Sequence, residues 1–375
     1  MELAKKIDLA ETIHDLINAN ISGIWQGYEA VPFILYDSKF RVAVGDGWPE
    51  CYRRERGNIW VAEGTDPNLM ANTVTKYHGK VVAIWNTENW SDTCPDAIDA
   101  TASIAHEMFH AYQNVSFTAP EANEMLLPQY PHSPLSVSLV IEENKNFVNL
   151  YENLDSAEKI ISILREIAEQ RACREKEIGK VFLEYDNGIE SWEGTSAYAE
   201  IQMHSKLEGI TPAKAALSYM PMISGANDGL LHMYRHRCYT TGVVLCLAAD
   251  IVCPDWKSEW IKSGVSLFDW MKEQLSIEVL GEADCPVLGE AEGIIKAFNA
   301  EKEKKIAEFK SQPLTVMEGD IRLLTFDPMN LTCLDGECLH KHGKIRCGNE
   351  ERLLTQPFLA EYGDNVLDIK RIWVA

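Results

Sequence analysis

Apolar residues recur at helical spacing near the start of the chain, and the pattern then changes to short β-type runs. Apolar positions over residues 7–20 fall on one face of a helix, which predicts an amphipathic helix there. The runs that follow are rich in β-branched and aromatic residues and are separated by turn-prone residues, as strands are. They read VPFILYD, FRVAV and NIWVA between residues 31 and 62, and KVVAIWN over 80–86. The chain is therefore expected to open with an α/β layer.

A helix with a start signal is predicted from about residue 93 to Asn114. Thr93 followed three residues later by Asp96 resembles a capping box, and Pro95 suits an early helical position. Nothing between these residues and Asn114 breaks a helix.

The middle of the chain is predicted to be helical and the end to be β-structured. A Pro-rich loop (119–134) precedes a long helical region over 137–182. Further helices are expected at 190–208, 212–220, 229–252, 266–276 and 289–310. After residue 312 the runs LTVM, IRLLTF, KIRC and VLDIKRIWVA alternate with turn dipeptides, which indicates strands. The fold class is thus α+β.

Composition narrows the possible partners. The chain has 57 Asp and Glu against 35 Lys and Arg, a net charge of −22. Such a surface repels nucleic-acid phosphates and anionic lipid headgroups, so we expect neither nucleic acid nor membrane as a partner. The first twenty residues contain charges throughout, and the apolar run 241–253 is too short to cross a bilayer. We therefore expect a cytoplasmic protein whose ten cysteines are mostly free.

The stretch SIAHEMFHAYQ (103–113) contains two candidate metal ligands and the candidate general base. His106 and His110 are four residues apart, so on a helix they project the same way and can share one metal ion. Zinc favours such ligands, and Glu107 lies where it can take a proton from a zinc-activated water, as in the pattern H-E-x-x-H. Asp99 and Ser103, upstream on the same helical face, are candidate partners of the imidazoles. The plainer interpretation is two half-buried histidines with ordinary hydrogen bonds.

A third ligand is needed for a catalytic zinc site. Gln113 and Ser116 occupy positions that exclude the three-histidine extension of the motif. The stretch ESWEGTSAYAE (190–200) offers a glutamate instead, and here the sequence resembles the gluzincin branch of zinc metallopeptidases. In that branch an E-G-x-x-x-Y helix completes the zinc site of H-E-x-x-H.

The resemblance implies a set of roles and an architecture. His106, His110 and Glu193 match the zinc ligands and Glu107 matches the general base, although Glu190 or Glu200 could bind in place of Glu193. The glycine and small residues after Glu193 are expected to let its helix approach the active-site helix closely.

The expected architecture has a zincin-like domain over 1–312 and a small β domain over 313–375. Within the first, 1–118 forms the α/β part that carries the H-E-x-x-H helix, and 119–312 forms the helical lobe. Strand 80–86 is expected at the edge of the cleft, where an extended peptide can add to it.

The segment HMYRHRCYTTG (232–242) offers donors for the oxyanion of a tetrahedral intermediate. A Tyr or His downstream of the glutamate helix has this part in the resembling peptidases. Tyr239 is the first candidate and His236 the second. The alternative is that the arginines of this segment form salt bridges and its tyrosine rings pack in the core.

Five possible soft ligands lie close together in the β region: Cys333, Cys338, His340, His342 and Cys347. They would suffice for a second, structural zinc ion, but their spacing matches no established zinc motif, and hairpin cysteines with incidental histidines are commoner.

The predicted function is zinc-dependent hydrolysis of a peptide bond in a peptide or protein substrate. The alternative is a zincin-like scaffold that binds a partner or ligand without cleaving it. The intact Glu107 favours hydrolysis, because an idle site need not retain its base.

Overall fold

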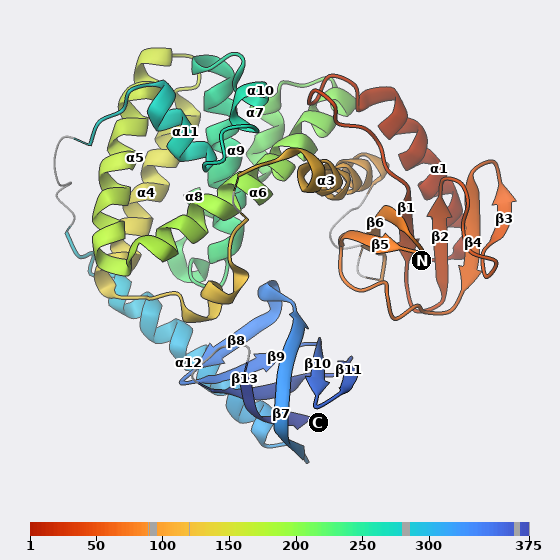
Figure 1. The fold of residues 1–375 in the computed structure, drawn as a ribbon. Coiled ribbons are helices and arrows are strands. Elements are labelled where there is room, and N and C mark those ends of the chain that lie inside the picture. Colours follow the sequence, from red (N-terminus) through yellow and green to blue (C-terminus); the bar gives the residue numbers. More distant parts are fainter. Residues whose placement is uncertain (89, 91–95, 120, 280–285, 364–367, 375) are drawn as a thin grey trace.

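The computed structural model describes residues 1–375 apart from 89, 91–95, 120, 280–285, 364–367 and 375. Three parts follow one another along the chain: a helix with a mixed sheet, a large helical lobe, and a C-terminal β sheet (Figure 1).

The N-terminal part packs helices against a sheet that has six strands in the described residues. The elements are α1 (Leu3–Asn20), β1 (Phe33–Tyr36), β2 (Phe40–Val44), β3 (Arg53–Arg56), β4 (Ile59–Glu63), β5 (Thr73–Tyr77) and β6 (Lys80–Asn86). The strand order is β3-β4-β2-β1-β6-β5. Successive side chains of a strand point to opposite faces. Phe33 and Leu35 accordingly meet the helices, whereas Ile34 and Tyr36 belong to a second apolar cluster. The predicted helix and its four strands are confirmed.

The expectation that an extended peptide can add to strand 80–86 is wrong, because this strand is not at the edge of its sheet. β6 lies between β1, to which it runs parallel, and β5, to which it runs antiparallel. The outer strand on this side is therefore β5. Its sequence TVTKY is only partly buried and lacks the continuous apolar run that marked the predicted strands.

The helix that carries H-E-x-x-H is α3 (Ala97–Ser116), which lies between the sheet and the helical lobe (Figure 1). The Asp96 carboxylate caps it by accepting hydrogen bonds from the backbone N–H groups of Ile98 and Asp99. Asp96 thus occupies the cap position itself. The predicted capping box would have placed Asp96 at the third helical position, so that prediction is wrong. Thr93 and Pro95 lie outside the described residues.

The helical lobe contains more breaks than the sequence pattern predicts. Its elements are η1 (Glu124–Gln129), α4 (Pro134–Glu152), α5 (Ala157–Ile178), α6 (Lys180–Glu208), α7 (Pro212–Ala215), η2 (Ala216–Ser218), α8 (Pro221–Ser224), η3 (Asn227–Gly229), α9 (Tyr234–Val252), α10 (Trp256–Trp260) and α11 (Leu267–Gln274). The helical region predicted over 137–182 comprises α4, α5 and the start of α6. Ser156 caps α5, and Gly179, with φ of 90°, separates α5 from α6.

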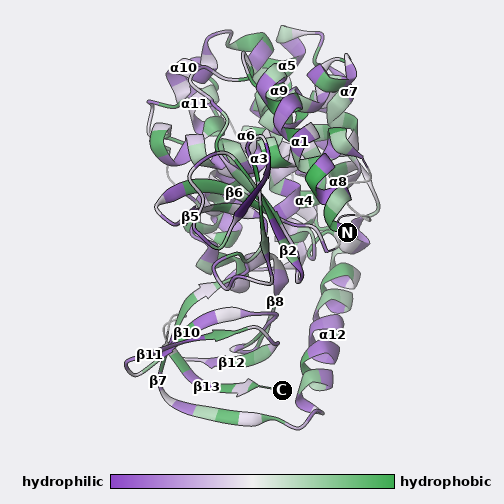
Figure 2. Cartoon of the chain, turned by 90° about the vertical axis from the view of Figure 1, so that its right-hand side faces the viewer, coloured by the Kyte–Doolittle hydropathy of each residue, from purple (hydrophilic) through white to green (hydrophobic). Residues whose placement is uncertain are grey.

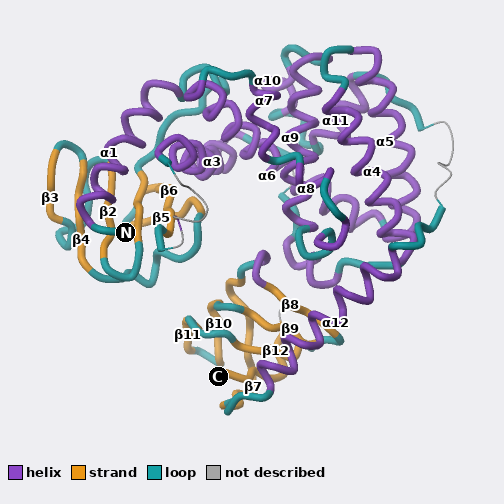
Figure 3. The backbone as a smooth tube through the Cα atoms, turned by 180° about the vertical axis from the view of Figure 1, so that it is seen from behind, coloured by secondary structure: helices purple, strands orange, loops and turns teal. Residues whose placement is uncertain are grey.

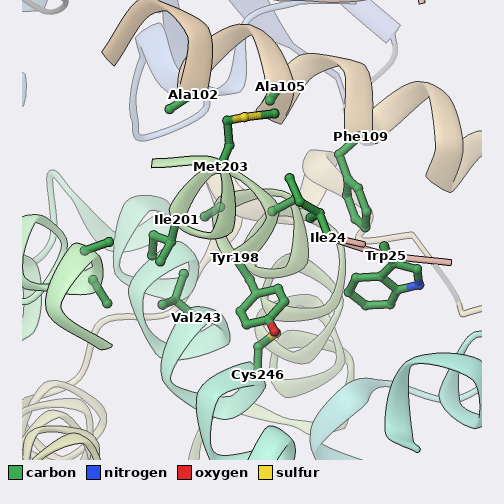
Figure 4. Close-up of a cluster of buried hydrophobic side chains, with 14 of the residues drawn as sticks. Ile24, Trp25, Ala102, Ala105, Phe109, Tyr198, Ile201, Met203, Val243 and Cys246 are labelled. Atoms are coloured by element: carbon green, nitrogen blue, oxygen red, sulfur yellow. The ribbon is translucent and has the colours of Figure 1, made fainter. Parts of the chain in front are cut away.

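The main core lies where α3, α6 and α9 meet (Figure 4). Ala102 and Ala105 of α3 face Met203 of α6, and Phe109 of α3 lies beside Ile24 and Trp25 in this view. On the other side of α6, Val243 and Cys246 of α9 complete the apolar contact. Burial of these side chains from water holds α3 against the lobe. None of the helices described here combines the length and apolar character needed to cross a membrane.

The C-terminal part is a β sheet joined to the lobe by one long helix, as Figures 2 and 3 show. The elements are α12 (Ala291–Lys310), β7 (Thr315–Phe326), η4 (Pro328–Asn330), β8 (Leu331–Leu334), β9 (Glu337–His340), β10 (Gly343–Cys347), β11 (Glu350–Leu354), β12 (Phe358–Tyr362) and β13 (Asp368–Val374). Their order is β11-β10-β7-β13-β12-β9-β8. The runs LTVM and IRLLTF form the single strand β7. Ile294 and Phe298 of α12 pack in the lobe, whereas Ile306 and Phe309 pack on the sheet.

Candidate metal centre

Two imidazoles and one carboxylate converge between α3 and α6. The Nε2 atoms of His106 and His110 lie 3.4 and 3.3 Å from the same oxygen, Oε2 of Glu193. The three side chains are buried, and their ligand atoms lie within 4.8 Å of one another. No other group of three or more possible ligands converges in this way among the described residues. The structure therefore brings the three predicted ligands together.

The outer nitrogens of both imidazoles are held by polar partners. His106 Nδ1 lies 3.0 Å from Glu200 Oε2, which also accepts a hydrogen bond of 2.7 Å from the Tyr219 hydroxyl. His110 Nδ1 lies 2.6 Å from Gln113 Oε1. An Nδ1–H that donates outward leaves the lone pair of Nε2 directed at the centre, which is how metal-ligating histidines are usually oriented.

Two small polar residues of α6, Thr195 and Ser196, hold the Gln113 side chain of α3 in place beside His110. Ser196 donates a hydrogen bond of 3.0 Å to Gln113 Oε1, and the Gln113 amide donates to Thr195 Oγ1 at 2.9 Å. Of the two expected partners of the imidazoles, Asp99 lies 3.3 Å from His204 instead, and Ser103 lines the same cavity as His106.

Gly194 does not have the predicted role of bringing α6 close to α3. It faces α9, where a Cβ on Gly194 would lie 2.6 Å from the Cα of Gly242. This close crossing of α6 and α9 places Arg235 and Tyr239 of α9 beside Glu193. Arg235 Nη2 donates to Glu193 Oε1 at 2.7 Å, and a second contact of 2.7 Å joins it to Glu124.

The charges around Glu193 favour its ionised form. Burial by itself would raise the pKa of this carboxyl, but His110, His106 and Arg235 outweigh burial and hold the pKa well below its usual range. Burial would lower the pKa of His106, yet Glu193 and Glu200 raise it to about 10. The carboxylate is thus set to attract a cation shared with the two imidazoles.

Glu107 lies next to this group and faces a cavity of about 480 Å³. The residue is 8% exposed, and burial raises the pKa of its carboxyl. A carboxyl with a raised pKa is a better proton acceptor at neutral pH than an ordinary glutamate. The other lining residues are Trp85, Ser103, His106, Glu200, Ser218, Tyr219, Pro221, Met222, His236, Tyr239 and Thr240.

Both predicted donors, Tyr239 and His236, line the same cavity. The Tyr239 ring stacks on that of His106 with centroids 6.0 Å apart and planes 12° apart, and its hydroxyl accepts a hydrogen bond from Arg235. Burial raises the pKa of Tyr239, so its phenol keeps its proton. Burial, with the charge of Arg235, lowers the pKa of His236 and favours the neutral ring. Arg235 also forms the salt bridges that the plainer interpretation expected.

The alternative ligands Glu190 and Glu200 have other partners. Glu190 lies in a buried ionic network of the lobe, where Arg171 Nη2 and the Thr241 hydroxyl each donate to its Oε1 at 2.6 Å. Glu200 lies behind His106. Glu193 is therefore the carboxylate that faces both Nε2 atoms.

The Cys/His cluster of the β sheet does not form a common ligand group. Cys333 and Cys338 are directly paired in the β8–β9 hairpin and form a disulfide, in place of the free thiols expected. His340 lies 2.8 Å from the Tyr362 hydroxyl and stacks on Phe358. His342 faces Asp327, and Cys347 is on β10.

Sequence reasoning missed the partners that orient the site: Gln113, Ser196, Glu200, Tyr219 and Arg235. Two of them carried a signal. Gln113 is three residues after His110, and Glu200 is seven residues after Glu193, so each shares a helical face with a predicted ligand. Arg235 and Tyr219 come from separate elements, and only the packing of those elements brings them to the site.

The donor set fits a zinc ion. Ligand atoms about 2.0–2.1 Å from one tetrahedral zinc lie roughly 3.3 Å from one another, close to the separations found here. Glu193 Oε2 is buried and faces the two Nε2 atoms at distances that a shared cation would bridge.

Comparison of the chain with protein-family models, with curated protein sequences and with solved structures gives no match. A proposal of function therefore rests on the geometry of the residues around His106.

Proposed function

We propose that this chain is a zinc-dependent hydrolase that cleaves peptide bonds, with a zincin-like arrangement of its catalytic residues. The observation that carries the proposal is the convergence of His106 Nε2 and His110 Nε2 on the buried Oε2 of Glu193. Two imidazoles, one carboxylate and an adjoining cavity are typical of a catalytic zinc site, which keeps one position open.

His106, His110 and Glu193 would hold the ion. When bound, zinc supplies a Lewis acid that polarises the substrate carbonyl and makes water more acidic. Glu107 takes the proton of the attacking water and passes it to the leaving amine, because its side chain faces the cavity beside the ligand group. The raised pKa of Glu107 suits both halves of this transfer.

Tyr239 and His236 are placed to stabilise the oxyanion. Both side chains line the cavity, and Tyr239 stacks on a ligand imidazole. A protonated phenol can donate a hydrogen bond to the oxygen that becomes negative as water adds to the carbonyl. Arg235 positions both the Tyr239 hydroxyl and the Glu193 carboxylate.

The test compares three proteins, each incubated with zinc, on a mixed peptide library analysed by mass spectrometry. The wild type should cleave peptides and lose this activity to a chelator. Glu107→Gln should keep zinc and lose at least about a hundredfold in rate, and His110→Ala should lose zinc itself. A wild type that binds zinc yet cleaves nothing would favour the alternative of a binding protein.

A further inference from the structure

A second pocket adjoins the proposed active site and is lined by cationic and imidazole side chains. It has a volume of about 420 Å³ and lies between the lobe and the C-terminal sheet. The lobe contributes His132 and His232, α12 contributes Lys302, and the sheet contributes Lys341. The cationic lining residues are Arg235, Lys302, Lys305 and Lys341, and in a chain with a net charge of −22 their gathering around one pocket calls for an explanation.

Lys302 is the cationic centre of this pocket. Its Nζ lies 4.0 Å from the centre of the Phe298 ring, and the His132 and His232 rings contact the same ring at 5.5 and 4.7 Å. No carboxylate in the described part of the chain forms an ion pair with Lys302. By contrast, the neighbouring Lys305 lies 2.7 Å from Glu301.

The surroundings of Lys302 make an anion favourable there. Burial lowers the pKa of its ammonium to about 8, because the group has lost water without gaining a negative partner. At neutral pH the group is still mostly charged. A carboxylate placed beside it would restore the lost stabilisation, with His132 as a further donor, whereas His232 already lies 2.9 Å from Glu301.

The pocket shares a wall residue, His236, with the cavity of the proposed active site. Arg235, which holds Glu193, also lines the pocket. A chain bound across the Glu107 cavity would pass His236 to reach Lys302. The C-terminal sheet forms the far wall, through Asn330 and Lys341 among others.

We propose that the pocket around Lys302 binds a carboxylate of the peptide substrate, supplied by an acidic side chain or by the C-terminus of the peptide. This proposal rests on the proposed function, since it names the substrate class of the same site. The apolar wall formed by Leu127, Leu231 and Phe298 would receive the methylene groups next to the carboxylate. The C-terminal sheet thereby becomes part of the substrate site.

The proposal is tested by binding, without turnover. Zinc-loaded Glu107→Gln protein is incubated with a library of random synthetic dodecapeptides, made once with free and once with amidated C-termini, and retained peptides are sequenced by mass spectrometry. Retained peptides should be enriched either in Glu or Asp at a fixed position or in free C-termini. The first result identifies a side-chain carboxylate, and the second identifies the terminal one.

Three further variants in the Glu107→Gln protein make the test specific to Lys302. Lys302→Gln should reduce the enrichment by at least about tenfold, whereas Lys302→Arg should preserve most of it. Lys296→Gln, an exposed position on the same helix, should change nothing. Equal enrichment with Lys302→Gln, or no acidic enrichment at all, overturns the proposal.

The wild-type library assay separates this proposal from the proposed function. Cleavage without any dependence on a carboxylate would overturn the Lys302 pocket alone. Retention of acidic peptides that the wild type never cleaves would overturn the peptidase activity and leave the pocket as a binding site.

Discussion

Gly194 of α6 packs directly against Gly242 of α9. A Cβ on Gly242 would lie 2.5 Å from the backbone oxygen of Glu190 and 2.6 Å from the Cα of Gly194, distances that packed atoms do not tolerate. Because the two helices cross this closely, Arg235 on α9 reaches Glu193 on α6. The crossing thus ties the orientation of a proposed zinc ligand to the backbone of the lobe.

Gly242→Ala should therefore both destabilise the protein and disturb the site. The added methyl group forces α9 away from α6, at a cost of about 1–3 kcal/mol. Unfolding by urea measures this cost, and zinc titration measures the effect on the site. Gly293→Ala is the matched control, because its Cβ would meet nothing within 4 Å in α12. That change should stabilise the helix by about 0.5–1 kcal/mol, and equal effects of the two substitutions would contradict the account.

Glu143 is the acidic centre of the buried network in the lobe. Its oxygens contact Arg171 at 2.9 Å and Arg237 at 3.1 Å, and Arg174 is also paired with it. Glu143→Gln should reduce the free energy of unfolding by about 3–5 kcal/mol, because it leaves buried guanidinium charge without a partner. The control Glu142→Gln removes a partly exposed pair with Lys145 and should cost less than about 1 kcal/mol. A small loss of unfolding free energy for Glu143→Gln would show that Glu143 is not the carboxylate that neutralises these three arginines.

The same residue predicts how stability depends on pH. Burial would raise the pKa of Glu143, but the three arginines outweigh it and hold the pKa well below its usual value of 4.5. The stabilisation is therefore complete above that value and declines as the pH falls toward the depressed pKa of the folded state. Urea midpoints between about pH 6 and pH 3 should fall in the wild type. They should fall less steeply in Glu143→Gln, and parallel curves would contradict this assignment.

Glu200 should act on the metal through His106. Its carboxylate fixes the His106 ring, so Glu200→Gln should weaken zinc binding by about 10–100-fold while leaving the fold intact. Competition with a chromogenic chelator measures the affinity, and circular dichroism checks the fold. Glu208→Gln, an exposed position at the end of the same helix, should leave the affinity unchanged. Equal affinities for the two variants would mean that Glu200 does not orient the ring.

Local sequence patterns predicted the elements with strong periodicity. Strands with a continuous apolar run, such as β1 and β6, were located correctly, whereas β3 (Arg53–Arg56) was missed because all four of its residues are exposed. The order of the strands was not predictable in this way. Which strand lies at the edge of the sheet depends on long-range pairing. β5 has the edge position next to β6, and its sequence is less apolar than that of β6.

In the candidate site, too, local spacing was predictable and the contacts between helices were not. The spacing of His106 and His110 follows from helical geometry, and the choice of Glu193 agrees with its position facing both imidazoles. Gly194 was correctly identified as a residue of close helix packing, but its partner is α9 and not α3. Helical spacing tells which residues share a face; it does not tell which helix that face meets.

The most direct test of the central claim is the zinc content of the purified protein after equilibrium dialysis, measured for the wild type, Glu193→Gln and Glu190→Gln. The account predicts one zinc ion per wild-type chain and a loss of at least about tenfold in affinity for Glu193→Gln. Folded Glu190→Gln protein should still bind one ion, because Glu190 faces Arg171 and Thr241. Undiminished zinc in Glu193→Gln, or a wild type that binds none, would contradict the account.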